Sequence, residues 1–493
     1  MSIENLPRLG LGLSSNLDAS DEPHPYRLLD QAPGLFDFVE YSAPLSLEQA
    51  RREASLFPEL FERREKVPAL FHPVHLNLFG PELEPPDRLA ELDAHARAVG
   101  SPWVGNDVGW WHARGEPFPG YLYLAPPLDA RGLENAVAHA LHVQAHLSVP
   151  LVLENPAVIA VRGGWHVLDF MARLHARTKA PLLVDLGHLW SYQLARGLPP
   201  NAGFDGFPFD QVAELHIAGG VVGRAGERRF YVDDHTQPVR EELFELLAEM
   251  LPRCSNLRAL TFEGDGHPAD VARITLERLR PLIRADPAKR EVPPSDARAP
   301  SSPGGEALGA PEAELAIALF KESYGLCPSE EDPSGTGAEL DFRLAVLAQQ
   351  LDRAFRVTRL LMAPDRQALL EFTQSAPFRA CFVDSERTLF KAFEAFAIDR
   401  LRARGDVELE AAVAIEALLS RGAGALSASR QKALSAVLRE ARFAAQALRR
   451  HLCGRAWVTG HLEHEALEAV RQALRRSLRG QALSGLASPA LRR

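Results

Sequence analysis

The sequence predicts a (β/α)8 TIM barrel followed by a separate all-α domain. Eight short apolar runs alternate with amphipathic segments in the first part of the chain, and β-strand signals nearly vanish after it. At 493 residues the chain is also too long for one ordinary domain. We expect a barrel over residues 1–285, a flexible linker over 286–311 and a helical accessory domain over 312–493.

The eight expected strands are short runs of β-forming residues that end at polar or turn-forming residues. They cover residues 9–14, 36–42, 69–76, 103–108, 150–155, 181–186, 212–218 and 257–264. Amphipathic segments such as 87–100 and 132–147 lie between them. A doubly wound open sheet is the alternative arrangement. The run LGLGLSSN, however, lacks the third glycine and the following helix of a dinucleotide-binding motif.

The linker and the second domain are predicted from a change in composition. Residues 286–311 are rich in Pro, Ser, Gly and Ala and have no apolar period, which is typical of a flexible connection. Beyond them, segments such as ELDFRLAVLAQQLDRAFRVTRLLM repeat apolar residues at helical spacing. This pattern predicts a helical bundle.

Composition restricts the class of protein. A hydrophobic content of 46% with 24% charged residues is normal for a soluble globular chain, and no apolar run reaches the roughly 18 residues of a membrane span. The four cysteines form no CxxC pair and the first residues do not resemble a secretory signal, so we expect a cytoplasmic protein. The net charge of −10 argues against a nucleic-acid partner.

Ionisable side chains gather at the expected carboxyl ends of the strands, where barrel enzymes place their active sites. They are His72, Asp107, Glu154, Asp185, His188, Glu214, His216 and Glu263, with Asp233 and His235 in the loop after the seventh strand. A single Asp-x-x-His is more simply a helix-capping aspartate with an incidental histidine. So many buried like charges, however, would repel one another strongly unless cations compensated them. The set predicts a site for about two or three metal ions.

The segments LGLGL, LENP, LLVD, AELHIAGG, VDDHTQPV and FEGD, in this order over residues 7–270, resemble the multinuclear non-heme iron-dependent oxidases. This family includes the methanobactin-biosynthesis oxidase. The resemblance implies a TIM barrel whose two or three irons use dioxygen to modify a ribosomally made precursor peptide, commonly at cysteine. It also implies the metal ligands His72, Glu154, Asp185, His216, Asp233, His235 and Glu263.

The chain departs from the family pattern at three positions. Asp107 stands where the family has a histidine, His188 stands where it has an asparagine, and Gly220 replaces another histidine. We count Asp107 and His188 among the expected ligands, so one imidazole is lost and another is gained nearby. Such an exchange changes which ion is rich in imidazole ligands, and therefore its redox potential.

Three further residues are expected to supply hydrogen bonds or proton transfer, on the basis of their positions alone: Glu214, Asn155 and Asp265. The helical domain is expected to help bind the peptide, the role that a separate partner protein has in the family. A fused domain would raise the local concentration of peptide at the barrel.

Two alternative functions remain open. The same barrel superfamily contains metal-dependent endonucleases and sugar isomerases, and the segment from Asp185 to His188 is closer to the endonuclease pattern. Zinc or manganese in place of iron would favour such hydrolytic chemistry. The aspartate at position 107 also allows a degenerate barrel that binds metal without catalysis.

Overall fold

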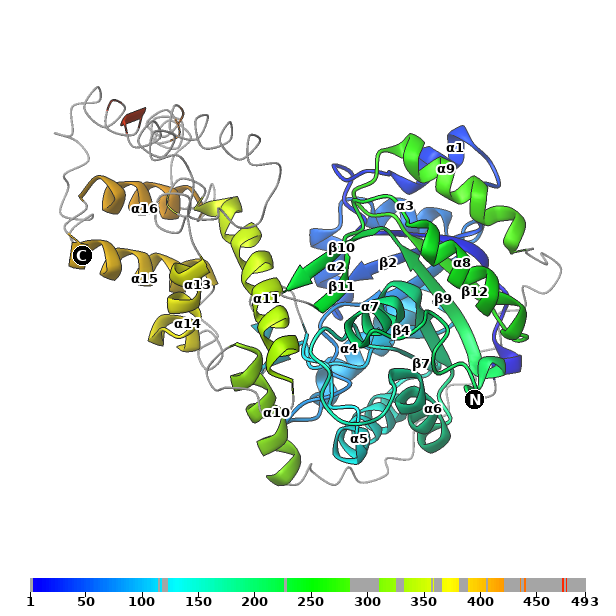
Figure 1. Cartoon of the computed structure of the whole chain (residues 1–493). Helices are drawn as coiled ribbons and strands as arrows, with labels where there is room; N and C mark the ends of the chain where they lie inside the picture. Colours follow the sequence, from blue (N-terminus) through cyan, green and yellow to red (C-terminus); the bar gives the residue numbers. More distant parts are fainter. Residues whose placement is uncertain are drawn as a thin grey trace. The chain divides into compact units, whose positions relative to one another are not determined.

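The computed structural model describes residues 3–113, 116–117, 123–225, 228–283, 310–324, 332–355, 366–380, 389–404 and 407–420, with isolated positions beyond and between them. Eight parallel strands close into a barrel in the order β1-β12-β9-β8-β7-β4-β3-β2 (Figure 1). The barrel strands are β1 (Gly10–Ser15), β2 (Phe38–Ala43), β3 (Ala69–Pro73), β4 (Val104–Asp107), β7 (Leu151–Glu154), β8 (Leu182–Asp185), β9 (Val212–Ala218) and β12 (Ala259–Glu263). Each falls within or overlaps one of the eight expected runs, and the predicted TIM barrel is confirmed.

Helices follow each of the barrel strands along the chain and pack on the outside of the barrel (Figure 1). They are α1 (Pro25–Gln31), α2 (Leu47–Glu53), α3 (Phe57–Arg63), α4 (Pro86–Val99), α5 (Ala130–His146), α6 (Val167–Thr178), α7 (Leu186–Arg196), α8 (Glu241–Met250) and α9 (Ala269–Leu279). Local chemistry sets several of their ends. Asp129 accepts hydrogen bonds from the first backbone N–H groups of α5, and Gly100 adopts the left-handed conformation that ends α4.

Two strand pairs are inserted between barrel strands along the chain. The short strands β5 (His112–Ala113) and β6 (Glu116–Pro117) follow β4, and the antiparallel strands β10 (Gly220–Ala225) and β11 (Arg228–Asp233) follow β9. Asp233, which the sequence placed in a loop with His235, is instead the last residue of β11. The side chain of Ser191 in α7 explains how β11 is held, because its hydroxyl bonds both the N–H and the C=O of Tyr231.

The interior of the barrel is apolar at its amino-terminal end. A cluster of buried side chains fills it and includes residues of the N-terminal segment: Ile3, Leu6, Leu9, Phe38, Leu70, Trp103, Val152, Leu183, Ala213 and Ala259. A larger apolar cluster lies between the strands and the helices. Polar side chains in the interior are thereby concentrated toward the carboxyl ends of the strands.

The chain forms two compact units, and the first contains the barrel together with residues 310–322 and 328–338. Within this unit Asp332 accepts two hydrogen bonds of 2.7 Å from the Arg228 guanidinium and one of 3.0 Å from the backbone N–H of Val161. Most of the expected linker lies outside the described residues. Its last two residues begin α10 (Ala310–Ser323).

Beyond residue 338 the described part of the second unit is mainly helical, as expected, and the unit also contains the short strand β6. Its helices are the later part of α11 (Pro333–Ala354), α13 (Arg366–Thr373), α14 (Ala376–Ala380), α15 (Leu389–Arg404) and α16 (Val407–Ser420). Buried aromatic rings form part of its core, with Phe393 5.2 Å from both Phe355 and Phe372 between ring centroids. None of the helices described in either unit is long and apolar enough to cross a membrane.

The second glycine of the LGLGL segment is required by packing. A Cβ atom added at Gly12 would lie 2.2 Å from Cζ of Phe38, a buried residue at the base of the barrel. Gly12→Ala should therefore lower the free energy of unfolding by about 1–3 kcal/mol, as overpacked cores do. Urea unfolding followed by tryptophan fluorescence measures this loss.

Gly164→Ala is the matched control, because nothing lies within 4 Å of the added Cβ. It should change stability by no more than about 0.5 kcal/mol. Combining Gly12→Ala with Phe38→Leu should recover part of the loss. Equal effects of the two alanine substitutions would contradict the packing argument.

Candidate metal centre

Ionisable side chains converge at the carboxyl ends of the barrel strands. Ten described residues form five overlapping groups, in each of which three potential ligand atoms lie within 4.8 Å of one another. The groups are Glu40–His72–His216, His72–Asp107–Glu154, Glu154–Asp185–His188, Asp185–His216–Glu263 and Asp233–His235–Glu263. The fold thus brings together all nine residues expected as metal ligands, and adds Glu40.

The strand register explains part of this convergence. Asp107 on β4 lies opposite Glu154 on β7, and Asp185 on β8 lies opposite His216 on β9. Because side chains alternate between the two faces of a strand, residues paired in this way at neighbouring ends point to the same side. All four side chains are buried. They form the deep part of the cluster.

Glu154 lies at the centre of the cluster. Its Oε2 is 3.6 Å from Nε2 of His72, and its Oε1 is 3.5 Å from Nδ1 of His216 and 3.8 Å from Nδ1 of His188. Three imidazoles from three different elements therefore approach one carboxylate. A carboxylate placed in this way can bridge neighbouring cations.

The group Asp233–His235–Glu263 lies nearer to solvent. Nε2 of His235 is 3.1 Å from Oδ2 of Asp233 and 3.7 Å from Oε2 of Glu263, and the three side chains are between 19% and 27% exposed. Asp233 is the last residue of β11, so the strand pair β10–β11 brings it to the barrel. This group forms the accessible side of the cluster.

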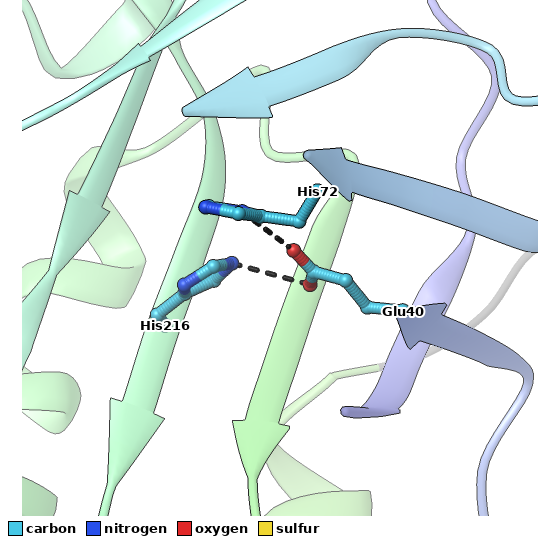
Figure 2. Close-up of side chains that lie close together, drawn as sticks. All are labelled: Glu40, His72 and His216. Atoms are coloured by element: carbon cyan, nitrogen blue, oxygen red, sulfur yellow. Dashed lines mark hydrogen bonds and ion pairs between the residues drawn. The ribbon is translucent and has the colours of Figure 1, made fainter. Parts of the chain in front are cut away.

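Glu40 was not expected as a site residue. It lies within β2 and not at its end, and its carboxylate faces His72 and His216 (Figure 2). The sequence does hold a signal, because Glu40 is a lone carboxylate inside the apolar run FDFVEYS. Because Glu40 lies inside its strand, the pattern of polar residues at strand ends does not include it.

Asp185 caps a helix and also belongs to the cluster. Its Oδ1 accepts a hydrogen bond from the backbone N–H of His188 and so caps α7. Its Oδ2 is buried among the described residues without a hydrogen-bond partner. One oxygen therefore holds the helix while the other faces the cluster.

The three residues expected to assist catalysis have different positions. The side chain of Asn155 bonds the backbone N–H and C=O of Asp185, and the backbone C=O of Asn155 accepts from Nδ1 of His188. Asp265 accepts from the hydroxyl of Ser14 and faces Nδ1 of His235 at 3.4 Å. Asn155 and Asp265 therefore contact members of the cluster from outside it.

Glu214 is completely buried on β9, two residues before His216. It accepts hydrogen bonds from Nε1 of Trp103 at 2.8 Å and from the hydroxyl of Thr261 at 3.1 Å. Burial, with the nearby charge of Glu40, raises the pKa of Glu214 to about 7. Its role in proton transfer stays a prediction.

Burial and mutual repulsion disfavour the ionised form of some carboxylates in the cluster. Burial, reinforced by the charge of Glu154, raises the pKa of Asp107 to about 7, and burial raises the pKa of Glu263 to about 8. Burial alone would lower the pKa of His216, but the surrounding carboxylates raise it well above its ordinary value. Without cations the cluster is therefore expected to take up protons.

Several buried polar atoms of the cluster have no hydrogen-bond partner among the described residues. They are Oε2 of Glu40, Oε2 of Glu154, Oδ2 of Asp185, Oδ1 of Asp233 and both ring nitrogens of His216. A buried acceptor without a partner costs about 1–3 kcal/mol. Cations bound by these atoms would remove that cost, so the donor set fits bound metal ions.

The structure shows the surroundings of the three departures from the family pattern. Asp107 accepts a hydrogen bond of 2.7 Å from the hydroxyl of Tyr123 and lies 3.6 Å from Nδ1 of His188. A Cβ atom at Gly220 would lie 2.5 Å from Cζ of Tyr231. The phenol ring of Tyr231 therefore leaves no room for a side chain at position 220.

Comparison with known proteins finds relatives over the barrel region. A UPF0276 protein of Caulobacter vibrioides is 26% identical over 270 residues, which cover 54% of this chain and 91% of the relative. A UPF0276 protein of Streptomyces avermitilis is 29% identical over 213 residues, which cover 42% and 43%. The crystal structure of endonuclease IV from Thermus thermophilus is similar with a TM-score of 0.36 and 20% identity, and the match covers 56% of this chain and 98% of that one.

The family model described as RiPP precursor modification enzyme MbnB/TglH/ChrH, where RiPP denotes a ribosomally made and later modified peptide, matches residues 10–280. This match spans the complete barrel and all ten residues of the cluster. The chain belongs to the MbnB/TglH/ChrH family of RiPP precursor modification enzymes.

Proposed function

We propose that this chain is a multinuclear iron-dependent oxidase that uses dioxygen to modify a ribosomally made precursor peptide at cysteine. Membership of the family supports peptide modification. The five overlapping groups of carboxylates and imidazoles carry the metal part of the proposal. Mixed oxygen and nitrogen donors suit iron, with manganese and zinc as alternatives.

Eight of the ten residues would hold about two or three ions. One ion would be held by His72, Asp107 and Glu154, a second by Asp185, His216 and Glu263, and a third by Asp233, His235 and Glu263. Glu263 belongs to the groups of the second and third ions and would contribute to both, and Glu154 also belongs to a further group with Asp185 and His188. Iron bound in this way supplies redox chemistry with dioxygen and a site for a soft thiolate ligand.

The protein's own residues define how a peptide would reach the cluster. The accessible group Asp233–His235–Glu263 marks the side of entry, since the deeper residues are buried. Trp111 and Tyr123 pack with their ring centroids 4.5 Å apart beside Asp107. These rings would exclude water from that flank of a bound cysteine.

The helical region is proposed to help bind the precursor peptide. This role rests on its fusion to the barrel in one chain, which would raise the local concentration of bound peptide at the metal centre. A chain that ends after residue 338 retains the barrel's compact unit. It should keep its metal content but lose about tenfold or more in kcat/KM for a cysteine-containing peptide encoded beside the gene.

Turnover and metal content of the shortened chain are measured against the full chain. Full turnover by the shortened chain would reject a peptide-binding role for the helical region. Loss of metal would show instead that the helical region supports the barrel, which would also contradict the proposal.

The identity of the metal separates the proposed function from its alternatives. The chain purified without oxygen should contain about two or three iron ions, and His216→Ala and Glu263→Ala should each lose metal because both residues belong to the cluster. Elemental analysis gives the counts. His146→Ala is the control, since its ring bonds the backbone C=O of His142 in α5, outside the groups.

Zinc or manganese filling the same site would favour a hydrolase of the endonuclease or sugar-isomerase type. Absence of metal would favour a degenerate scaffold. An Asp107→His variant with greatly raised activity would also point to degeneration, whereas lost metal in that variant would support Asp107 as a ligand.

Removal of metal should lower the stability of the barrel. Without cations several buried polar atoms of the cluster have no hydrogen-bond partner among the described residues, so a chelator should shift thermal unfolding to lower temperature. Metal at 100 times its dissociation constant should add about 2.7 kcal/mol per independent site. Thermal unfolding with and without chelator measures the difference. The Glu263→Ala chain should respond less, and an equal response would contradict stabilisation through the cluster.

A further inference from the structure

The carboxylate of Glu40 contacts two imidazoles, one with each of its oxygens (Figure 2). Oε1 lies 3.1 Å from Nδ1 of His72, in hydrogen-bond geometry, and Oε2 lies 3.2 Å from Nε2 of His216. The two rings come from β3 and β9, and Glu40 comes from β2. Glu40 is 3% exposed, so water does not compete strongly for these contacts.

The second nitrogen of each ring faces the centre of the cluster. Nε2 of His72 is 3.6 Å from Glu154, and Nδ1 of His216 is 3.5 Å from Glu154 and 3.6 Å from Glu263. Two donors on one ion, each about 2.1 Å from it, are about 3.0–3.5 Å apart. These contacts are too long for hydrogen bonds and lie at or just beyond the upper end of that range, whereas the Glu40–His72 contact has hydrogen-bond geometry.

An imidazole that binds metal through one nitrogen usually donates the N–H of the other to a carboxylate or carbonyl, which fixes its tautomer and orientation. Glu40 lies close to two rings at once, in hydrogen-bond geometry with His72 and at ion-pair distance, without hydrogen-bond geometry, from His216. His72 belongs to the group with Asp107 and Glu154, whereas His216 belongs to the group with Asp185 and Glu263. The two rings would thus serve two different ions.

We propose that Glu40 is a positioning residue that orients His72 and His216 for two neighbouring metal ions, with the proton on Nδ1 of His72 and on Nε2 of His216. This inference rests on the metal centre of the proposed function, but not on its oxidase chemistry. Glu40 would couple the two sites, because a shift of one ring changes the carboxylate that holds the other.

The competing assignment makes Glu40 itself a ligand, with an ion between it, His72 and His216. Such an ion would have one carboxylate and two imidazoles on that side. The next carboxylate, Glu214, has Oε1 3.5 Å from Nε2 of His216, but both of its oxygens already accept hydrogen bonds, from Trp103 and Thr261. The side facing Glu154 offers Asp107, Asp185 and Glu263 in addition. The positioning role is therefore favoured.

Metal titration of Glu40→Gln tests the proposal, because this change keeps the shape of the side chain and removes its charge. Cobalt(II), whose visible absorption reports ligand geometry, is added under anaerobic conditions in competition with a chelator. A positioning residue predicts the same number of ions at saturation as in the unchanged protein, an affinity about 10- to 100-fold lower and a shifted cobalt spectrum. Loss of one ion with unchanged spectra of the others would overturn the proposal and make Glu40 a ligand.

Glu84→Gln is the matched control. Glu84 is equally buried and its Oε1 lies 2.5 Å from Nε2 of His112, but it belongs to none of the five groups. It should leave cobalt affinity and spectrum unchanged. The same changes in both variants would mean a general effect of removing a buried carboxylate and would overturn the positioning role. If the unchanged chain bound no cobalt and no iron, the proposed metal centre itself would fail.

A second measurement needs no substitution and covers the case in which Glu40→Gln does not fold. In the zinc-loaded chain with ¹⁵N-labelled histidine, long-range ¹H–¹⁵N correlation spectra distinguish the two tautomers of each ring. His72 should carry its proton on Nδ1, and His216 should carry its proton on Nε2. The opposite tautomer at either ring would overturn the proposal.

Discussion

Compensation of buried negative charge is the constraint on which the rest of this structure depends. Six carboxylates and four imidazoles share one end of a barrel whose other end is filled with apolar side chains. Each buried charge needs a proton, a hydrogen bond or a cation. The fold supplies some of these partners, such as Tyr123 for Asp107 and the N–H of His188 for Asp185. The acceptors left over lie beside imidazole nitrogens in groups whose possible ligand atoms are within 4.8 Å of one another, an arrangement that suits bound cations.

Most of the fold and much of the candidate site follow from local patterns in the sequence. A strand that is buried on both faces has a continuous apolar sequence. The run ends at the carboxyl end of the strand, where polar residues of an active site lie. Asp107, Glu154, Asp185 and Glu263 are such end residues. Once eight strands close in parallel, their carboxyl ends share one rim, so sequence order alone brings these residues together.

The features that could not be predicted depend on where a residue lies within its strand and on contacts between segments that are far apart in the sequence. Glu40 lies within its strand, and only the position of His72 and His216 on other strands shows that its carboxylate belongs to the cluster. The strand pair β10–β11 was missed because two short strands of mixed polarity resemble a loop when no partner is known. Asn155 has a polar amide just after a strand end, but that amide forms hydrogen bonds with the backbone N–H and C=O of Asp185.

The three departures from the family pattern are better explained as a rearranged donor set than as its loss. At position 220 the space beside the backbone is filled by Tyr231, whose hydroxyl bonds the C=O of Ala218, so no imidazole can stand there. His188 brings an imidazole to the other side of the cluster, and its Nδ1 faces the backbone C=O of Asn155 at 3.0 Å. If that nitrogen carries the proton, Nε2 is left as the donor, 3.7 Å from Asp233. Asp107 keeps an anionic donor opposite Glu154. The nine expected ligands still lie together although the types of some differ from the family pattern, and this weighs against a degenerate scaffold.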